Sequence, residues 1–502
     1  MNNHDSYESV IDAAIIGGGP AGTAAARILA ERGHRVVVFA RDPDPVRAFT
    51  ESLPPSACQL LATIGILDAM DGNGFVRSYG NTVWWAEREG VDERFGDGET
   101  YGFQVSRPRF DNLLLDHAAA AGAVVRRGAA VTEVVDVGDD LALRVAEGRR
   151  DAHEVRARFV LDCSGRSGVM ARHHRRYEPA LRGQALMGVW RAGRWPVIDA
   201  GHTLVESWED GWGWSVPAGG DVRHVGILVD GERTAVERGA GFTATYLATL
   251  ARMRHLHEVV ADAVLERAWA CDASVYDSRH YAGERYLLAG DAASFIEPLS
   301  SFGVKKALAS GWMAAVAAHT CLSHPDRRRL ALEFFSDWER RVYTTSVEQS
   351  QRYAREALAR YQRPFWQARA AVSPPPADIC VDDLLAAPGV QTTFERLRSA
   401  PARLRVAPAV TVVPRPVIRD GIIAPEDAIL LSEDTLAIRF VRGVDVLAVI
   451  ELARAGLEAG TLIARYVERF GSHTLPDLLT AIALLVDRSV LIADPIASST
   501  KT

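Results

Sequence analysis

The amino-acid sequence predicts an α/β protein with several domains, and three observations support this fold class. An apolar run, a glycine-rich turn and a helical pattern follow one another within residues 11–32. Five tryptophans fall between positions 190 and 214, among strand-like runs. A proline-rich break at residues 373–376 precedes a further stretch in which strands come before helices. With 502 residues, the chain is long enough for two or three domains.

The composition narrows the classes of partner. Hydrophobic residues make up 48% of the chain and charged residues 24%, proportions typical of a soluble globular protein. The net charge of −7 argues against nucleic acid, which usually requires a concentrated basic surface. No uncharged apolar run reaches the roughly 18 residues that span a bilayer, and the N-terminus lacks a signal-peptide pattern. We therefore expect a cytoplasmic protein without a nucleic-acid or membrane partner.

The five cysteines are widely spaced and form no CxxC pair; they are Cys58, Cys163, Cys271, Cys321 and Cys380. Their odd number and their spacing predict neither a disulfide framework nor a zinc site. We expect no bound metal.

A glycine-rich turn lies between the first predicted strand and the first predicted helix. Gly17, Gly19 and Gly22 form a GxGxxG pattern after the strand at residues 11–16 and before a helix that starts at Thr23. In a βαβ unit, such glycines permit a tight turn, close approach of backbone amides to a pyrophosphate, and helix packing on the strand. The pattern therefore predicts a Rossmann-like domain that binds a dinucleotide.

The end of the second predicted strand, at residues 35–39, departs from the usual pattern. An acidic residue usually binds the adenosine ribose there, whereas this chain has Ala40 followed by Arg41. Two alternatives remain open. Asp42 binds the ribose from the next position, or Arg41 packs against the adenine or binds a phosphate.

A second candidate binding segment follows the apolar run at residues 286–289. Gly290 and Asp291 precede a helical pattern with small residues at Ala307 and Gly311. A carboxylate at a strand end accepts sugar hydroxyls, and the amides of a helix N-terminus face an anionic group. Because Gly-Asp is also common in turns, its role depends on the glycine turn upstream.

The intervening patterns divide the chain into four parts. The nucleotide-binding domain comprises residues 1–170 and 271–325, with a helix at 111–118, a β-meander at 124–125, 131–135 and 141–145, and a strand at 159–163. Residues 171–270 form a mostly antiparallel β-sheet substrate domain with aromatic side chains on one face. This density of tryptophan favours a flat aromatic pocket, with ordinary core packing as the alternative.

The C-terminal part is predicted to contain a helical segment at residues 326–375 and an accessory module at 376–502. The module combines short strands with three helices and is winged-helix-like. Its balanced charges favour docking of a peptide, a protein or a second subunit over binding of DNA.

Several motifs together resemble a known class of protein. Gly17-x-Gly19-x-x-Gly22, the segment Asp162-Cys163-Ser164-Gly165 and Gly290-Asp291, in this order, resemble the glutathione-reductase-type FAD proteins. Trp212-Gly213-Trp214-Ser215-Val216-Pro217 resembles the Trp-x-Trp-x-x-Pro signature of flavin-dependent halogenases, within the class A flavoprotein monooxygenases. Glu51 to Pro55 resembles their Gly-Glu-x-x-x-Pro segment, with Thr50 in place of the glycine. The resemblance covers about residues 10–345.

The resemblance implies FAD as the cofactor. It places the pyrophosphate over Gly17, Gly19 and Gly22, and the ribityl or phosphate region at Asp291. Gln104 and Arg107 would lie along the cofactor, and Pro298 to Gly303 would lie beside the isoalloxazine ring. The substrate would lie near Trp212, Trp214 and Phe302. NADH, NADPH or a separate flavin reductase would supply the electrons.

Two departures from the halogenase pattern bear on the reaction. Halogenases of this type carry a lysine downstream of the Gly-Glu segment that captures or steers hypohalous acid, and the window at residues 76–85 contains none. Phe302 stands where the halide site usually has a small Ser or Thr. We therefore predict an FAD-dependent monooxygenase that hydroxylates an aromatic substrate through a flavin C4a-hydroperoxide. Halogenation of an aromatic or carrier-bound substrate is the alternative.

Glu51 and Glu297 are the candidate catalytic bases, because both belong to motif segments near the expected flavin; a structural role for each is the alternative. Some lysine-lacking relatives hydroxylate tryptophan in a protein or peptide during maturation of tryptophylquinone cofactors. The resemblance therefore favours an indole or a peptide-bound tryptophan, which the C-terminal module suits. A flavin-binding regulatory protein and a reductase of isoprenoid chains are further alternatives, and the aromatic density argues against the latter.

Overall fold

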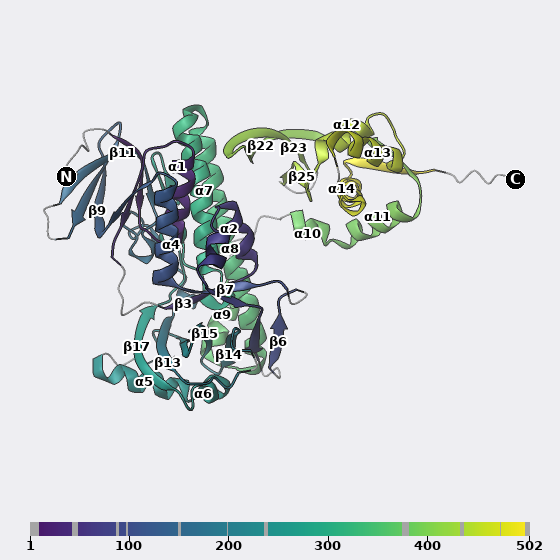
Figure 1. The fold of residues 1–502 in the computed structure, drawn as a ribbon. Helices are drawn as coiled ribbons and strands as arrows, with labels where there is room; N and C mark the ends of the chain where they lie inside the picture. Colours follow the sequence, from purple (N-terminus) through teal and green to yellow (C-terminus); the bar gives the residue numbers. More distant parts are fainter. Residues whose placement is uncertain are drawn as a thin grey trace. The chain divides into compact units, whose positions relative to one another are not determined.

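The structure is a computed structural model. It describes residues 10–42, 49–86, 90–96, 99–148, 152–197, 199–234, 239–373, 381–431, 436–471 and 473–496. The chain divides into two compact units, Met1–Pro375 and Pro376–Thr502 (Figure 1). Residues 374–376 of the proline-rich break and Cys380 lie outside the described ranges. No helix in those ranges is long and apolar enough to cross a lipid bilayer.

The first unit is built on a sheet of eight strands that carries the glycine turn. Strand β1 (Ile11–Ile16) lies between β2 (Val36–Ala40) and β11 (His153–Asp162) and runs parallel to both. Both β1 and β2 are nearly continuous apolar runs, as expected for parallel strands covered on both faces. Helix α1 (Pro20–Glu31) connects β1 to β2. The predicted βαβ unit is therefore present.

One predicted part of this sheet is wrong. Strand β8 (Val124–Arg127) does not start a meander but pairs in parallel with β2. It follows helix α4 (Arg107–Ala120), and a strand that returns through a helical crossover enters a sheet in parallel. The antiparallel meander instead consists of β9 (Ala129–Asp136), β10 (Leu141–Glu147) and β11. At the edge opposite to β8, the sheet continues with β20 (Tyr286–Leu288) and β19 (Ala282–Gly283).

Two long helices, α7 (Gly303–Ser323) and α8 (Arg328–Arg360), run together beside α1 (Figure 1). Helices α1 and α7 cross at very short range, because a Cβ at Gly311 would lie 2.1 Å from the backbone oxygen of Ala21. Only glycine permits this approach, which holds the two helices together at the level of the glycine turn.

A second sheet of seven strands is mostly antiparallel, as predicted. Its order is β17 (Val264–Asp272), β13 (Gln184–Arg191), β16 (Val222–Val229), β15 (Gly211–Gly219), β14 (Thr203–Trp208), β5 (Gly80–Trp84) and β6 (Val91–Arg94). Strands β14 and β5 pair in parallel. Residues 80–84 and 91–94 therefore join a sheet whose other strands come from a much later part of the chain.

The expectation that the aromatic side chains share one face of this sheet is wrong. Trp190 and Trp208 belong to a core with Tyr246 of helix α5 (Phe242–Leu250), whereas Trp212 packs in a different core with Trp366. Strand pairing gives the reason. Ser207 pairs with Trp212, so Trp212 points to the side of Ser207, and Trp208 points to the opposite side.

The first unit also contains a small sheet, a pair of strands and four shorter helices. They are the three-stranded sheet of β3 (Thr50–Leu53), β7 (Gly102–Ser106) and β4 (Val76–Ser78), the pair β12 (Arg175–Tyr177) and β18 (Tyr276–Ser278), and the helices α2 (Ser56–Thr63), α3 (Leu67–Gly72), α6 (Arg254–Val259) and α9 (Pro364–Ala370).

The second unit has its own hydrophobic core, which includes Leu404, Leu462 and Ile482. Its elements are α10 (Val381–Leu385), α11 (Pro388–Ser399), β21 (Ala402–Val406), β22 (Thr411–Arg419), β23 (Ile422–Leu430), β24 (Ala437–Ile438), β25 (Phe440–Val441), β26 (Val444–Asp445), α12 (Val446–Ala453), α13 (Ala459–Phe470), α14 (Leu475–Asp487) and β27 (Leu491–Pro495). The hairpin β22–β23 followed by three helices has the order of elements expected from the sequence.

Candidate functional site

The turn between β1 and α1 has the geometry of a phosphate-binding cradle. Gly17 has a φ of 113°, and a Cβ there would lie 2.3 Å from the backbone oxygen of Cys163. A Cβ at Gly22 would lie 2.0 Å from the oxygen of Gly17. Helix α1 begins after Gly19 without a side-chain cap, so its first amides are available to an anion. A Cβ at Gly19 would meet only the Arg107 guanidinium, at 3.8 Å, which leaves the cradle open.

The Gly290–Asp291 turn lies beside this cradle, as the sequence interpretation requires. Gly290 has a φ of 61°, and a Cβ there would lie 3.0 Å from the Cβ of Ala21 in helix α1. The Tyr276 hydroxyl donates to the backbone oxygen of Asp291 at 2.6 Å. The fold thus brings together two motifs that lie far apart in the sequence, and together they have the chemistry that a dinucleotide requires.

Three buried side chains form a hydrogen-bonded cluster at the Gly290 turn. We call these residues, Lys306, Ser310 and Glu339, the Gly290 clamp. The Gly290 N–H donates to the Ser310 hydroxyl at 2.7 Å. The Lys306 ammonium donates to the Gly290 oxygen at 2.8 Å and also to the Ser294 oxygen. The Ser310 hydroxyl in turn donates to Oε1 of Glu339 on helix α8. Lys306 is 4% exposed and Glu339 is completely buried.

Burial shifts the pKa values within the clamp. Burial lowers the pKa of Lys306. Burial also raises the pKa of Glu339 from its ordinary 4.5 to about 7, although Lys306 and the hydrogen bond from Ser310 oppose this shift. The second carboxyl oxygen of Glu339 has no hydrogen-bond partner among the described residues, which suits a protonated acid.

We expect the stability of the FAD-free protein to fall as the pH rises across this range, because of Glu339. Between about pH 4.5 and pH 7 the unfolded chain has lost the Glu339 proton while the folded protein keeps it, so raising the pH favours unfolding. A difference of 2.5 pKa units (7 − 4.5) corresponds to about 3 kcal/mol. Urea unfolding should be measured at about pH 5 and about pH 7.5. At the higher pH, the free energy of unfolding of Glu339→Gln should exceed that of the unmodified protein by about this amount. Equal pH dependence of the two proteins would contradict the assignment.

A second charged group links the cradle to the start of helix α7. Arg107 is the first residue of α4, and its guanidinium lies 2.5 Å from Oε1 of Glu51 and 3.1 Å from Oδ2 of Asp111. Burial raises the pKa of Glu51, with Arg107 opposing. Burial disfavours the Arg107 charge, but Asp111 and Glu51 outweigh this and raise the pKa of Arg107 above its ordinary value. Arg107 is therefore a fixed cation beside the cradle.

The predicted residues near the flavin ring lie at the N-terminus of α7. Pro298 begins a short turn, Phe302 caps α7, and Gly303 is its first residue. A Cβ at Gly303 would lie 3.8 Å from Oε2 of Glu51. The structure therefore brings Glu51, Arg107, Gly303 and the glycine turn into one connected region.

Glu297 has a different environment from Glu51. It is 6% exposed, and its Oε1 lies 3.4 Å from Nε of Arg369 on helix α9. The Trp212 indole N–H approaches the same oxygen at 3.5 Å. Burial lowers the pKa of Arg369, with Glu297 opposing. This ion pair favours a positioning role for Glu297, because its side chain is only 5% exposed, whereas that of Glu51, which also pairs with a cation, is 22% exposed.

Trp212 belongs to an aromatic cluster between the second sheet and helices α8 and α9. Its ring lies 4.9 Å from that of Trp214, and the Trp85 ring lies 5.5 Å from that of Trp366. Trp212 is 2% exposed, whereas Trp214 is half-buried. Trp214 is therefore the more accessible of the two predicted substrate residues.

Two predicted cofactor residues have different surroundings. The end of β2, which Arg41 follows, contacts the glycine turn. Arg41 is exposed immediately after β2. Gln104 is buried in β7, and its amide donates to the Gly201 oxygen at 3.2 Å and to the Thr203 hydroxyl at 3.0 Å. The Gln104 side chain thus connects β7 to the start of β14, on the side of the second sheet.

Sequence reasoning missed the clamp and Arg369. Ser310 and Lys306 are spaced four residues apart on α7, so they share a helix face, and this spacing was the available signal. Glu339 and Arg369 stand among many other charged residues on polar helices, and nothing in that pattern marks them as buried.

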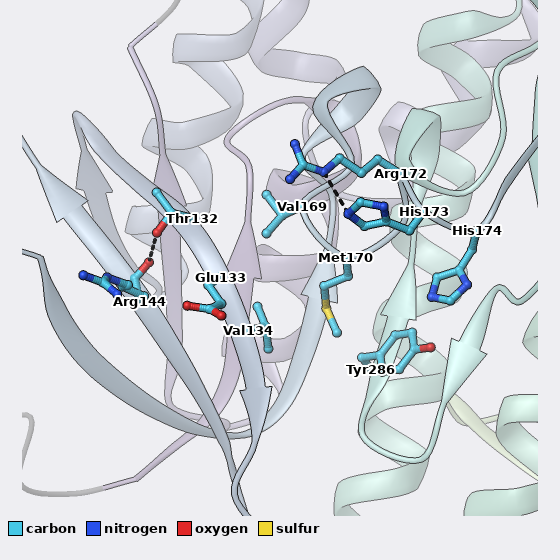
Figure 2. A pocket seen from close by; sticks show the side chains of 10 residues that line it. All are labelled: Thr132, Glu133, Val134, Arg144, Val169, Met170, Arg172, His173, His174 and Tyr286. Carbon is cyan, nitrogen blue, oxygen red and sulfur yellow. Dashed lines mark hydrogen bonds between the residues drawn. The ribbon is translucent and has the colours of Figure 1, made fainter.

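The structure also has a pocket away from the cradle, with a volume of about 630 Å³ (Figure 2). Val134, Met170 and Tyr286 form an apolar part of its lining, and Arg144 and Arg172 line it with charge. Arg172 donates to the His173 ring at 3.3 Å. Among the described residues that line this pocket, none belongs to the predicted site.

Comparisons with known proteins concern the family and the fold of this chain. The sequence matches the family described as FAD binding domain over residues 10–315. The flavin-dependent halogenase armH3 of Armillaria mellea is 30% identical over 338 residues, which cover 61% of this chain and 66% of that protein. The chain thus spans just under two thirds of that relative's length.

Two solved structures share the fold over nearly the whole chain. CmlS, a flavin-dependent halogenase, aligns with a TM-score of 0.77 and 23% identity over 97% of this chain and 96% of the other. The peptidyl tryptophan dihydroxylase QhpG, essential for tryptophylquinone cofactor biogenesis, aligns with a TM-score of 0.68 and 22% identity over 96% and 99%. At these identities the likeness concerns the fold.

Proposed function

This chain belongs to the FAD binding domain family, as an FAD-dependent enzyme of the halogenase-like monooxygenase branch, and we propose that it hydroxylates an aromatic substrate. FAD is the cofactor, and one relative, from Chondromyces crocatus, is a tryptophan 2-halogenase. The open questions are which atom is transferred and to which substrate.

The residues of the cradle suit FAD. When it is bound and reduced, FAD supplies the activation of molecular oxygen. In the proposed arrangement the amides after Gly19 bind the pyrophosphate, the fixed cation Arg107 balances its charge, and Asp291 accepts hydroxyl groups. Gly303, at the N-terminus of α7, would hold the ring system, and the amides of that helix end would stabilise negative charge there.

One observation favours hydroxylation over halogenation, namely the small number of lysines and their positions in the chain. The chain has only three lysines, Lys305, Lys306 and Lys501, and none lies in the window at residues 76–85. The Lys306 amine is buried and bonded to two backbone oxygens. With FAD supplying the oxygen chemistry, hydroxylation of an electron-rich ring would require no amine from the protein.

Halogenation is a second candidate because of Lys305. Its amine lies 4.7 Å from the centre of the Phe302 ring and bonds the Ser56 hydroxyl at 2.9 Å. Burial lowers the pKa of this amine. An amine at the N-terminus of α7 could direct hypohalous acid from a position other than the usual one, so Lys305 is the residue on which this alternative depends.

The two candidate carboxylates receive separate roles in the proposal. Glu51 is the proton acceptor, because its pKa is raised and its side chain remains 22% exposed. Glu297 is a positioning residue, because its bond from Trp212 fixes one wall of the aromatic cluster. The proposed substrate is an indole or a peptide-bound tryptophan, whose flat ring would pack against the half-buried Trp214.

The proposed reaction consumes one molecule of oxygen, two electrons and two protons, with the electrons supplied by NADH, NADPH or a flavin reductase. One oxygen atom enters a ring C–H bond and the other leaves as water. Its test is aerobic turnover of tryptophan, indole and tryptophan-containing peptides with isotopically labelled oxygen, with and without bromide, followed by mass spectrometry. We expect one labelled oxygen in the product and no bromine. Bromine incorporation that disappears in Lys305→Ala would instead establish the second candidate.

A further inference from the structure

We propose that the Gly290 clamp positions the Gly290–Asp291 turn for FAD, so that Glu339 of helix α8 is a positioning residue of the cofactor site. This inference holds for hydroxylation and for halogenation alike, because it concerns the binding of FAD and not the atom transferred.

The first argument is that side chains of α7 bind both backbone polar groups of Gly290. Gly290 is left-handed, with a φ of 61°, so its peptide groups point away from the path of an ordinary strand. Its N–H is bonded by Ser310 and its oxygen by Lys306. Side chains four residues apart on a helix lie on the same face, so α7 holds both polar groups of Gly290 at once.

The second argument is the direction of the hydrogen bonds. The Ser310 oxygen accepts from the Gly290 N–H, so the Ser310 proton is free to be donated elsewhere. It is donated to Glu339 Oε1, which fixes the rotation of the hydroxyl. Glu339 thus acts on Gly290 through Ser310, and its task is to supply an acceptor oxygen.

The third argument is position along the chain. The family match ends at residue 315, whereas Glu339 lies on α8, beyond it. The cofactor turn is therefore supported by a helix outside the segment that defines the family. Asp291, the residue presented to FAD, follows Gly290 directly, so a change in the Gly290 peptide would turn the Asp291 carboxylate.

The experiment compares FAD dissociation constants of full-length variants, measured by quenching of FAD fluorescence on titration of the apo protein. Ser310→Ala and Glu339→Met should each raise the dissociation constant by about tenfold, which is the effect of losing one well-formed hydrogen bond in the site. Glu339→Gln should stay within about threefold, because its amide oxygen still accepts from Ser310.

Two matched controls separate positioning from loss of stability. Thr320→Val removes another buried hydroxyl of α7, bonded to the Val316 oxygen and remote from Gly290. Glu333→Gln removes an exposed carboxylate of α8 that pairs with Arg329. Both should bind FAD as the unmodified protein does, and circular dichroism should show all variants folded.

The proposal is overturned if folded Ser310→Ala binds FAD as tightly as Thr320→Val, or if Glu339→Gln and Glu339→Met weaken binding equally. Should Ser310→Ala not fold, the contrast between the two Glu339 variants decides the question, because only one of them keeps the acceptor oxygen.

Discussion

Replacing Gly19 by alanine is expected to raise the dissociation constant for FAD by about a hundredfold while the apo protein stays folded. In the structure the added Cβ meets only the Arg107 guanidinium, at 3.8 Å, so nothing in the protein resists it. The same Cβ would occupy the open cradle and keep a phosphate from the amides of α1. Losing a charge-assisted hydrogen bond costs about 1.5–3 kcal/mol, and about 1.4 kcal/mol corresponds to a tenfold change. Fluorescence titration of FAD measures the effect directly.

Two other glycines provide the controls for this prediction. Gly17→Ala should also lower the stability of the apo protein, by about 2 kcal/mol or more, because of its left-handed φ and the overlap with Cys163. Gly72→Ala, where a Cβ meets nothing within 4 Å, should change neither property. Unchanged FAD affinity in Gly19→Ala would remove the cradle from the cofactor site.

Replacing Arg369 by methionine is expected to destabilise the first unit by about 3–5 kcal/mol, the range for breaking a buried ion pair on one side. The variant leaves the Glu297 carboxylate buried without its cation, and it also frees the Arg182 oxygen, to which Arg369 donates at 3.1 Å. Urea unfolding followed by tryptophan fluorescence is a suitable measurement, because Trp212 contacts Glu297.

The matched control is Arg363→Met, six residues earlier, whose partner Asp210 is more exposed. That pair should contribute little to stability, because solvent screens exposed ion pairs. The double variant Arg369→Met, Glu297→Gln should recover much of the loss, because no unpaired charge then remains buried. A single variant no less stable than Arg363→Met would show that Glu297 is not held by Arg369.

The parts of the fold that the sequence predicts best are those with strong local signals. The run at residues 11–16, Gly17 and the following helix form a βαβ unit because each position has a local steric reason. The orientation of the tryptophan side chains, by contrast, has no local signal in the sequence. Whether Trp208 and Trp212 face the same core depends on the hairpin register between β14 and β15, which no local pattern reveals.

The site shows the same division. Gly19 and the Gly290–Asp291 turn were found because turn chemistry and spacing mark them. The partners of these residues were not found, because burial decides their roles. Glu339 belongs to a charged helix whose pattern resembles that of an exposed one, and only the packing of α8 on α7 buries it. Gln104 was expected along the cofactor, and its contacts with β14 became visible only in the folded chain.

Gly311 sets a length as well as a contact. Helix α7 begins at Gly303, eight residues before its crossing with α1 at Ala21, and a rise of about 1.5 Å per residue makes this segment about 12 Å long. The N-terminus of α1 lies at the same crossing. The helix crossing therefore fixes the distance between the N-termini of α1 and α7. A prosthetic group bound across both would be held at a fixed end-to-end length.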